Sequence, residues 1–508
     1  MKSSDLAGLS DRSPGRTGPP PAAGPAGGQR LADLLAQLNP YPAYKDSGVP
    51  WLGQVPEHWE VRRAKWLFRQ LARPIGESDD VVTCFRDGTV TLRKNRRLRG
   101  FTEALKEVGY QGVRRGDLVI HLMDAFAGSI GVSDSDGKCS PVYVVCEAAP
   151  IACVYYYAHV LREMARRGWI TALARGIRER STDFRFQEFG AQILPLPPLP
   201  EQTAIVRFLD YMDRRIRRSI RAKQKLIKLL EEYKQALIHQ AVTGQTDVRT
   251  GQPYPAYKPS GVEWLGQVPA HWEVRRLGSV TQILNGATPS SSSPEYWDGD
   301  IVWITPDDLG KLNGRYIDNS SRRITQEGYN ACGTTLAPAG SVVLSTRAPI
   351  GHLGILRVAA CANQGCRLLI PHAATASEFL YHMLFAARPS LEVLGQGSTF
   401  LELSRPKLEM FPIPFPPLPE QTAIVEYLDA QTAKLDAAMA AAGREIELLR
   451  EYRERLIADV VTGKVDVREV AAQLPEETEE ETEPPEEETT SIEETDGEDS
   501  EEETDGEE

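Results

Sequence analysis

Residues Tyr41–Arg63 read YPAYKDSGVPWLGQVPEHWEVRR, and residues Tyr254–Arg276 read YPAYKPSGVEWLGQVPAHWEVRR, with only three differences. A second pair, PPLPEQTAIV, runs over 197–206 and again over 416–425. Between these repeated blocks lie two long segments that have no evident identity to each other. The chain is therefore predicted to be a duplicated scaffold that carries two divergent inserts.

The length and charge narrow the class of protein. A chain of 508 residues is long enough for about three or four domains. Its formal charge of -13 is misleading, because 20 of the 71 acidic residues lie in 474–508 and the remainder of the chain is net basic. Within 61–115 we count 14 Lys and Arg against 6 Asp and Glu. Such an excess indicates either a nucleic-acid-binding surface or an ordinary solvated one.

The cysteines and the apolar runs favour a protein of the reducing cytoplasm. The seven cysteines form no CxxC pair, which suits free thiols. A zinc site made by Cys361, Cys366 and His372 is conceivable, but structural roles are favoured and we expect no metal. No apolar run approaches the length of a membrane span. The first 30 residues are rich in Pro, Gly and Ser, lack a signal-peptide core and are expected to be disordered.

Each PPLPEQTAIV block opens a long predicted helix. Proline and glutamate at its start favour a helix N-terminus, and Thr243-Gly244 and Thr462-Gly463 favour C-termini. Apolar residues then recur at alternating four- and three-residue spacing. Two helices of about 40 residues with such seams predict an antiparallel coiled coil, and the alternative is that each helix packs separately on its own domain. The seam residues are Ile205, Leu209, Met212, Ile216, Leu226, Leu230, Tyr233 and Leu237 in the first helix, and Ile424, Leu428, Leu435, Leu449, Tyr452 and Leu456 in the second.

The inserts, 64–195 and 277–413, are predicted to mix strands and helices. Asp117–Met123 and Ser341–Ser345 are typical of strands, and Tyr155–Arg166 and Ala376–Ala387 of helices. A short helix is expected at Leu31–Asn39. His58 and His271, which stand beside tryptophans in the repeated blocks, are interpreted as structural hydrogen-bonding groups rather than catalysts.

Catalytic motifs are missing from the sequence. There is no Walker A motif and no HExxH. Phe126–Gly131 faintly resembles a glycine loop for a methyl-donor cofactor, but its glycine spacing is wrong. We therefore expect the chain to be non-catalytic by itself.

Recognition motifs are present in both inserts. The first carries the basic run Arg93, Lys94, Asn95, Arg96, Arg97 and Arg99, whose side chains suit phosphates and base edges but are also typical of a solvated surface. The second places Asn285, Thr288, Ser345, Thr346, Arg347, Asn363 and Gln364 in turns rich in Gly and Pro. Such turns fit loop-borne recognition or ordinary turn chemistry. If each of the two different inserts reads DNA and both are held on one scaffold with pseudo-twofold symmetry, the DNA target should have two unlike halves and should not be palindromic. The unread spacer between the halves would then be set by the length of the helices.

The repeats resemble those of the specificity subunits of type I restriction–modification systems. The resemblance rests on Leu196–Gln202 and its second copy, on the two Tyr-Pro-x-Tyr-Lys blocks, and on the motifs Trp303–Leu309 and Arg347–Gly351, and it covers about residues 41–470. It implies an α+β fold in which two mixed α/β target-recognition domains are separated by two long antiparallel coiled-coil helices, with an internal pseudo-twofold repeat.

The domain boundaries follow from this resemblance. We expect a disordered N-terminus at 1–40, a first target-recognition domain with its lead-in block at 41–195 and a first spacer helix at 196–245. A second block and target-recognition domain are expected at 246–413, a second spacer helix at 414–470 and an acidic disordered tail at 471–508.

The resemblance also implies partners. Double-stranded DNA would be bound together with two methyltransferase subunits and two restriction or motor subunits. This chain would bind no cofactor, while the partners would use S-adenosylmethionine, ATP and Mg²⁺ to methylate adenine N6 and to cleave foreign DNA.

By the same resemblance, Asn285–Ser290, Ser345–Gly351 and Gln396–Thr399, with Ser398 and Thr399, would be DNA-facing loops. Arg93–Arg99 and Ala127–Gly131 would be their counterparts in the first reader. The helical faces with Glu201, Gln202, Glu420 and Gln421 would lie near the methyltransferase. The alternatives are a specificity subunit of a methyltransferase–nuclease without a motor, a protein-binding scaffold, and an enzyme with a degenerate cofactor loop.

Overall fold

The computed structural model describes residues 38–96, 108–173, 184–395 and 402–475, which fall into two compact units. Unit 1 combines the residues up to Arg215 with those from Tyr452 onward, and unit 2 runs from Ile216 to Glu451. Each long helix therefore contributes to both units. The helix predicted at Leu31–Asn39 lies outside the described residues except for its last two positions.

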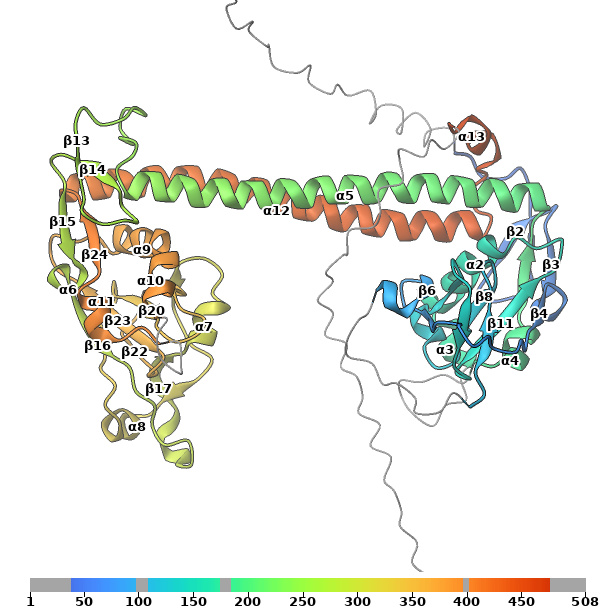
Figure 1. The fold of residues 1–508 in the computed structure, drawn as a ribbon, viewed down its shortest axis with the longest axis horizontal. Helices are drawn as coiled ribbons and strands as arrows, with labels where there is room; N and C mark the ends of the chain where they lie inside the picture. Colours follow the sequence, from blue (N-terminus) through green and yellow to red (C-terminus); the bar gives the residue numbers. More distant parts are fainter. Residues whose placement is uncertain (1–37, 97–107, 174–183, 396–401, 476–508) are drawn as a thin grey trace, which may run out of the picture. The chain divides into compact units, whose positions relative to one another are not determined.

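Unit 1 is built around a four-stranded antiparallel sheet with the strand order β4-β11-β8-β9. Its strands are β4 (Phe68–Gln70), β8 (Leu118–His121), β9 (Ile130–Val132) and β11 (Tyr143–Ala148). Helix α2 (Val154–Arg166) packs against this sheet (Figure 1). The strand predicted within Asp117–Met123 and the helix predicted at Tyr155–Arg166 are thus confirmed.

Short elements complete this insert. Two further antiparallel pairs are β5 (Val82–Cys84) with β6 (Val90–Leu92) and β7 (Gln111–Val113) with β10 (Gly137–Cys139). The helical turns are η1 (Ala64–Trp66), η2 (Arg93–Asn95), η3 (Ala125–Ala127), α3 (Trp169–Leu173) and α4 (Phe186–Ala191).

Unit 2 contains a five-stranded sheet with the order β16-β23-β20-β21-β18 and a three-stranded sheet with the order β19-β17-β22. The strands are β16 (Thr281–Asn285), β17 (Trp297–Ile304), β18 (Tyr316–Ile317), β19 (Arg323–Ile324), β20 (Val342–Ser345), β21 (Leu353–Leu356), β22 (Ala360–Ala362) and β23 (Cys366–Pro371). The helices are α6 (Leu277–Val280), η4 (Pro294–Tyr296), α7 (Pro306–Gly310), α8 (Gln326–Ala331), α9 (Ser377–Ala386), α10 (Arg388–Gly395) and α11 (Arg405–Glu409). Strand β20 and helix α9 confirm the predictions at Ser341–Ser345 and Ala376–Ala387.

In both inserts the central strand is buried on both faces. Along β20, Val342 and Leu344 join one apolar cluster while Val343 joins another. Along β8, Leu118 and Ile120 face one cluster and Val119 faces a second one. Since successive side chains of a strand point to opposite faces, a short continuous apolar run is the pattern expected of a covered strand.

The two repeated blocks have the same strand pairing, and each one pairs with the strand that leaves its insert. In the first block β1 (Tyr44–Asp46) pairs with β2 (Gln54–Pro56), and in the second β13 (Tyr257–Pro259) pairs with β14 (Gln267–Pro269) in the same register. The strand that enters each insert then pairs with the strand that leaves it: β3 (Glu60–Arg63) with β12 (Ile193–Leu196), and β15 (Glu273–Arg276) with β24 (Pro412–Phe415). Both blocks are thus built on paired strands. Their pseudo-twofold relation in space stays a prediction.

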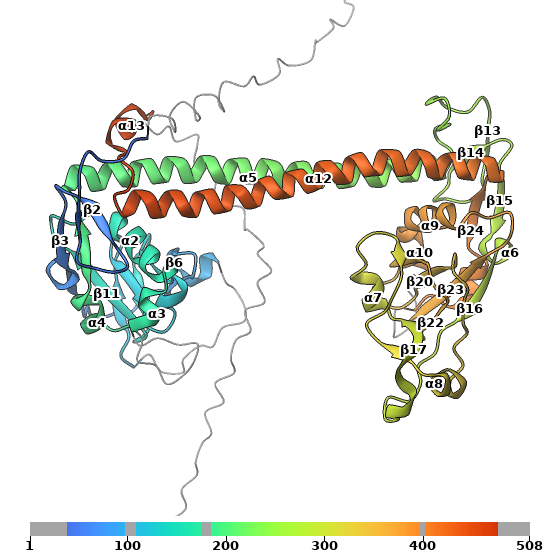
Figure 2. The same ribbon diagram turned by 180° about the vertical axis from the view of Figure 1, so that it is seen from behind.

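Two helices of 44 residues each, α5 (Leu199–Val242) and α12 (Leu418–Val461), run side by side (Figures 1 and 2). In unit 2, Lys223 pairs with Glu445 and Lys234 pairs with Asp436, so numbers rise along one helix as they fall along the other. In unit 1, Asp213, which is nearer the start of α5, pairs with Arg453, which is nearer the end of α12. The helices are therefore antiparallel where they pair inside each unit.

The predicted seam needs a correction. Ile216, Ile220 and Ile446 are buried together, with Ile227 and Leu449 packed against them. Leu226 and Tyr233, which were predicted to lie in the seam, are 47% and 57% exposed. Both the seam and the exposed stripe repeat at four- and three-residue spacing, so the spacing alone does not say which one faces the partner helix.

A third repeat follows the helices and was missed in the sequence. Thr243–Arg249 reads TGQTDVR and Thr462–Arg468 reads TGKVDVR. Gly244 adopts a φ of +75°, and a Cβ on it would approach Pro269 Cδ to 2.4 Å, so glycine is required both by its conformation and by the close packing. Gly463 packs in the same way on Pro56.

The predicted terminal boundaries also need a correction. In unit 1 the backbone of Asn39 bridges Asp466, as Gln252 bridges Asp247 in unit 2. Helix α13 (Arg468–Gln473) buries Val470 and Ala471, and Leu474 is only 5% exposed. Residues 38–40 and 471–475 are thus folded rather than parts of tails, because their apolar side chains pack against the core of unit 1.

No described helix is both long enough and apolar enough to span a membrane. The seven cysteines are free thiols, five of them buried. Among the described residues no group of three or more His, Cys, Asp or Glu side chains could hold a metal ion.

The corrected seam predicts different costs for two similar truncations. Ile220→Ala removes a buried seam side chain and should destabilise the protein by about 2–4 kcal/mol. Leu226→Ala removes an exposed side chain and should change stability by less than about 0.5 kcal/mol. Urea unfolding followed by circular dichroism measures both changes in stability. Equal losses would show that Leu226 also lies in the seam.

Candidate nucleic-acid interface

The predicted recognition residues of unit 2 come together at one edge of its larger sheet. Strand β23 lies between β16 and β20, so Asn285 stands opposite Arg367, and Ser345 stands opposite Cys366. The end of β16, the start of β23 and the end of β20 therefore meet, because neighbouring antiparallel strands begin and end at a shared edge.

Backbone hydrogen bonds bind these segments into one cluster, which we call the unit 2 loop cluster (285–290, 304–306, 345–351, 363–367 and 402–403). Ala287 N donates to Ala362 O at 2.9 Å, and Asn363 N donates to Ile304 O at 2.9 Å. Thr346 N donates to Gly365 O at 2.8 Å. In the same way Leu403 N donates to Thr346 O at 2.8 Å. Five segments far apart in sequence are thus held at fixed positions around Gly365.

The surface of this cluster carries polar side chains. Asn285, Thr288, Gln364 and Arg347 are exposed, and Thr288 Oγ1 donates to Gln364 Oε1. The Gln364 amide NH₂ is then still available as a donor. Asn363 is turned inward, since its Oδ1 accepts from Gly365 N at 2.9 Å. The exposed groups offer both donors and acceptors, as a base-reading surface requires.

The prediction that Ser345 and Thr346 face DNA is wrong. Both are fully buried. Ser345 Oγ donates to Pro349 O at 2.7 Å and accepts from His352 N at 2.8 Å, while Thr346 Oγ1 donates to Gly365 O at 3.3 Å. They shape the loop that presents Arg347 and do not face solvent. Ser398 and Thr399 lie outside the described residues.

Two arginines share one carboxylate beneath this surface. Glu402 Oε2 lies 3.2 Å from Arg347 Nε, and Glu402 Oε1 lies 3.5 Å from Arg367 Nη2. Arg367 Nη1 also donates to the carbonyls of Gln364 and Cys366. Burial lowers the pKa of Arg367 and Glu402 opposes that effect, although a guanidinium stays charged in proteins. The site therefore keeps a net positive charge. No motif in the sequence pointed to Glu402.

In unit 1 the basic run is largely paired inside its own insert. Lys94 pairs with Asp80, and Arg96 Nη1 donates to Asp87 Oδ2 at 2.7 Å while its guanidinium lies over the ring of Phe85. Burial raises the pKa of Asp87, but hydrogen bonds from Thr89 and Arg96 hold it below its usual value. A phosphate bound here would compete with these carboxylates.

Two further residues of the run contact side chains of their own insert. Arg93 Nε donates to Thr83 Oγ1 at 3.3 Å, and Asn95 Nδ2 donates to Thr91 Oγ1 at 2.9 Å. Arg97 and Arg99 lie outside the described residues. None of these contacts tests DNA binding, so the first reader's contact residues stay predictions.

The glycines in Phe126–Gly131 have a packing role. A Cβ on Gly131 would lie 2.0 Å from Gly88 O, so β9 can approach the turn at Gly88 only with glycine here. Gly128 has a φ of +93°, which glycine adopts without strain. These glycines are therefore accounted for by packing and conformation, without a cofactor.

Each repeated block is fixed to a long helix through one buried carboxylate. Glu201 Oε1 accepts from Tyr41 Oη at 2.6 Å and from Trp59 Nε1 at 2.8 Å, and His58 Nε2 lies 2.9 Å from Oε2. Burial and the carboxylate beside it raise the pKa of Tyr41, which therefore remains a donor. We call this group of four side chains the first anchor.

Unit 2 repeats the arrangement as a second anchor. Glu420 Oε2 accepts from Tyr254 Oη at 3.2 Å and from Trp272 Nε1 at 2.9 Å, and His271 Nε2 lies 2.8 Å from Oε1. Burial raises the pKa of Glu420, but the hydrogen bonds from Trp272 and His271 and the charge of Arg249 outweigh it and hold the pKa below its usual 4.5. The structural role predicted for both histidines is confirmed.

The glutamines beside these carboxylates are interior groups. Gln202 accepts from Cys153 N and donates to the carbonyls of Ile151 and Pro197. Gln421 does the same with Ala376 N, Ala374 O and Pro416 O. The four side chains predicted near the docking surface are thus at most 8% exposed and bonded inside their own units, which corrects their expected role.

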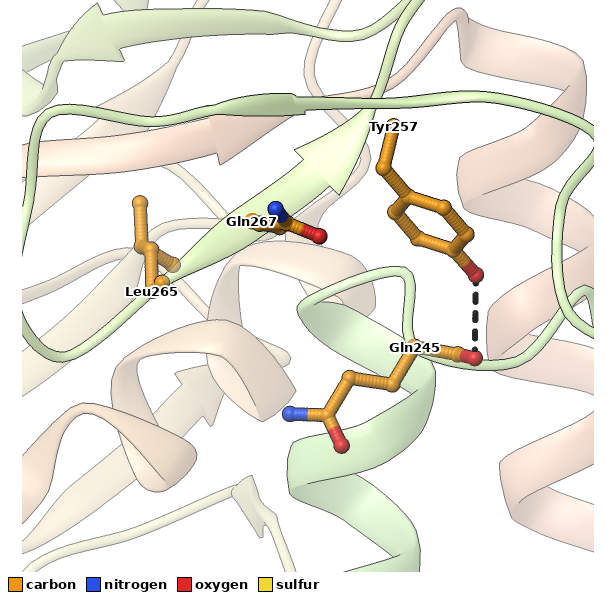
Figure 3. A pocket seen from close by; sticks show the side chains of 5 residues that line it. Gln245, Tyr257, Leu265 and Gln267 are labelled. Carbon is orange, nitrogen blue, oxygen red and sulfur yellow. Dashed lines mark hydrogen bonds between the residues drawn. The ribbon is translucent and has the colours of Figure 1, made fainter.

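A small pocket of about 300 Å³ lies beside the end of α5 (Figure 3). It is lined by Gln245 and by the hairpin residues Tyr257, Leu265, Gly266 and Gln267. Tyr257 Oη donates to Gln245 O across it at 3.1 Å. No charged side chain lines it, and it lies apart from the unit 2 loop cluster in sequence.

In comparison with known proteins, residues 269–447 match the model of the family described as "Type I restriction modification DNA specificity domain". The MjaIX type I restriction enzyme specificity subunit of Methanocaldococcus jannaschii is 37% identical over 166 residues, which are 32% of this chain and 38% of that protein. The EcoR124I/EcoR124II specificity subunit of Escherichia coli is 26% identical over 250 residues, or 47% of this chain and 58% of that one. These matches span less than two thirds of either relative.

A putative MjaX specificity subunit of Methanocaldococcus jannaschii matches more widely, at 24% identity over 82% of this chain and 96% of its own. A chain solved in a structural study of complex assembly and conformational transition of the type I R-M system shares the fold, with a TM-score of 0.60 at 22% identity. That match covers 80% of this chain and 98% of the solved one. The predicted resemblance to type I specificity subunits is confirmed.

The second anchor predicts a pH-dependent contribution to stability. Glu420→Ala leaves the buried donors of Trp272 and Tyr254 without an acceptor and should cost about 2–4 kcal/mol at pH 7. Because the folded-state pKa of Glu420 is depressed, its contribution is complete above the usual value of 4.5 and is lost as the pH falls through the folded value. The stability gap to the wild type should therefore narrow in acid.

Urea unfolding at pH 7 and below pH 4.5 measures this gap. Glu426→Ala removes an exposed carboxylate from the same helix and should leave stability unchanged at both pH values. If the difference in unfolding free energy between the wild type and Glu420→Ala stays constant across the pH range, the ionised Glu420 carboxylate is not the source of the stabilisation.

Proposed function

We propose that this chain, which carries a type I restriction–modification DNA specificity domain, is the DNA-reading subunit of a type I complex. It reads a bipartite, asymmetric target in double-stranded DNA and is not itself an enzyme. Two methyltransferase subunits methylate adenine N6 with S-adenosylmethionine, and two restriction or motor subunits cleave unmethylated DNA with ATP and Mg²⁺. Methylation would require the target adenine to be extruded from the duplex.

The two anchors carry this proposal. The same tyrosine, tryptophan and histidine side chains hold one buried glutamate at the start of each long helix. Each anchored block is joined to a different insert through the β3–β12 and β15–β24 pairs. The same anchor, present twice beside two unlike inserts, is the arrangement expected if each insert reads its own half of an asymmetric target. The dependence of the spacer on helix length stays a prediction.

The unit 2 loop cluster supports base reading in one half. Its exposed amides, hydroxyl and guanidinium stand on rigid, mutually bonded loops, so they lose little conformational freedom on binding. Arg347 can exchange Glu402 for a guanine edge or a phosphate, because its side chain is 47% exposed and, among the described residues, its ion pair is with Glu402 alone.

The methyltransferase is proposed to dock on an exposed apolar stripe of the helices. Leu226, Leu229 and Tyr233 recur on one face of α5 at 47%, 52% and 57% exposure. On α12, Leu448 is 62% exposed. Apolar side chains at helical spacing that no described residue covers are suited to a partner helix. This surface replaces the interior residues Gln202 and Gln421 as the docking candidate.

Long-read methylation sequencing tests the function as a whole. DNA from cells that express this chain with its neighbouring methyltransferase should carry N6-methyladenine in one asymmetric two-part motif. A continuous palindrome, or no motif from a complex shown to assemble, would reject the proposal. A neighbouring gene for a motor subunit distinguishes a type I complex from a methyltransferase–nuclease without a motor.

Arg347→Ala should relax reading at one half-site only. Loss of a bidentate contact costs about 1–3 kcal/mol of discrimination. The methylated motif should therefore become degenerate at one or two positions of a single half. Arg357→Ala is the control, because Arg357 is an exposed arginine of unit 2 that pairs with Asp318 outside the loop cluster. Equal loss at both halves would make Arg347 a scaffold residue.

The combined change Leu229→Ser and Tyr233→Ser should weaken binding of the purified methyltransferase by at least about tenfold, without lowering the stability of the chain. Leu336→Ser, at a 43% exposed leucine away from both long helices in sequence, serves as the control. Sedimentation velocity measures the association. Unchanged binding would show that the methyltransferase docks on another surface of the chain.

A further inference from the structure

Helix α5 carries a row of basic side chains that neither the anchors nor the seam uses. Arg218, Arg221, Lys225 and Lys228 follow one another at three- and four-residue spacing, which places them on one helical face. Arg221 is half-buried and the other three are exposed. We call these four residues the α5 basic stripe. None of them has an ion-pair partner among the residues that the structure describes.

The helix pair itself does not require this stripe. The cation of α5 that bridges to α12 in this stretch is Lys223, which pairs with Glu445. In the facing stretch of α12, the exposed carboxylate of Glu447 pairs with Arg450 of the same helix and not with the stripe. Four uncompensated cations within about 15 Å of helix repel one another and favour a polyanion as occupant.

The C-terminal segment leaves the described part of the chain beside the same helix. Leu474 is buried, and Arg207 Nη2 of α5 donates to Leu474 O at 2.7 Å and to Pro475 O at 3.4 Å. Helix α13 precedes this point and lies next to the N-terminal part of α5 (Figures 1 and 2). The last residue described, Pro475, is therefore held on α5 by Arg207.

The segment that follows has the complementary charge. Residues 476–508 hold 20 acidic side chains and no Lys or Arg. From Arg207 the α5 basic stripe begins about 16 Å along the helix and ends about 32 Å along it, at 1.5 Å per residue. A chain of 33 residues can reach about 110 Å, so its length is sufficient.

We propose that residues 476–508 bind the α5 basic stripe of the same chain. The segment acts there as an internal polyanion that occupies cations otherwise open to nucleic-acid phosphates. Each exposed ion pair contributes little, but tethering makes the contacts intramolecular, and several form together. Salt should weaken the contact, because exposed charges are screened. This inference does not depend on the proposed DNA target.

Carbodiimide cross-linking of the full-length chain tests the contact directly. The reagent joins a carboxylate to a lysine amine with loss of water, and only when the two groups lie in contact. At 50 mM salt, mass spectrometry should find links from 476–508 to Lys225 and Lys228. These links should disappear at 0.5 M salt. Lys434, an exposed lysine of α12, is the internal control and should remain unlinked to the segment.

A second measurement tests the consequence for nucleic acid. A chain that ends at Pro475 should bind a non-target duplex at least about tenfold more tightly than the full chain at low salt. Replacing all four stripe residues with Gln in the shortened chain should abolish this gain. It should also reduce the salt slope by about 3–4, because each released phosphate contact contributes about 0.9. Circular dichroism confirms that the variants are folded.

Three results would overturn the proposal. The first is cross-linking of the segment mainly to lysines of the first insert, such as Lys65 or Lys94, instead of to the stripe. The second is an absence of links together with unchanged duplex binding after truncation. The third is an equal loss of duplex binding on stripe neutralisation with and without the segment, which would make the stripe a nucleic-acid contact that the segment does not cover.

Discussion

The structure depends on two buried carboxylates, Glu201 and Glu420, each in the first turn of a 44-residue helix. A carboxylate at a helix N-terminus is favoured by the helix dipole, but burial makes it costly unless donors surround it. The repeated block supplies these donors from a tyrosine, a tryptophan and a histidine. This explains why the block repeats so closely while the inserts do not. These side chains of the block must all donate hydrogen bonds to one buried carboxylate, which restricts their identity. An insert is restricted only at its two ends, where its first and last strands pair.

The long helices show how one element can serve several surfaces. Along α5, Ile216 and Ile220 face the seam, Leu226 and Leu229 remain exposed, and Arg218 and Lys225 project from a further face. All three rows repeat at three- and four-residue spacing, so all three satisfy the heptad pattern. Burial, and not periodicity, separates the row that holds the fold from the rows that are free to bind.

Much of the architecture could be predicted because it follows from local signals. Glycine after threonine marks the helix ends, and short apolar runs mark β8 and β20. The site was harder to predict. The meeting of Asn285 with Arg367 depends on the strand order, which the sequence does not encode locally. Ser345 was misjudged because a hydroxyl in a Gly/Pro-rich turn looks exposed in sequence. Here it bonds to the backbone of its own loop instead. Glu402 was missed because a lone carboxylate near a loop has no motif.

The described cations predicted to contact DNA include three that are held in ion pairs. Lys94, Arg96 and Arg347 each face a carboxylate, so a phosphate must displace a partner before it binds. Such paired cations attract DNA weakly until a well-placed acceptor completes the exchange, which favours discrimination over general attraction. The four cations of the α5 basic stripe have no such partner among the described residues, and they would attract any duplex equally. If the acidic C-terminal segment covers them, as we propose, the sequence-independent attraction is reduced while the reading loops remain accessible. Specificity is a difference between affinities, so a device that lowers only the non-specific affinity increases specificity without changing a base contact.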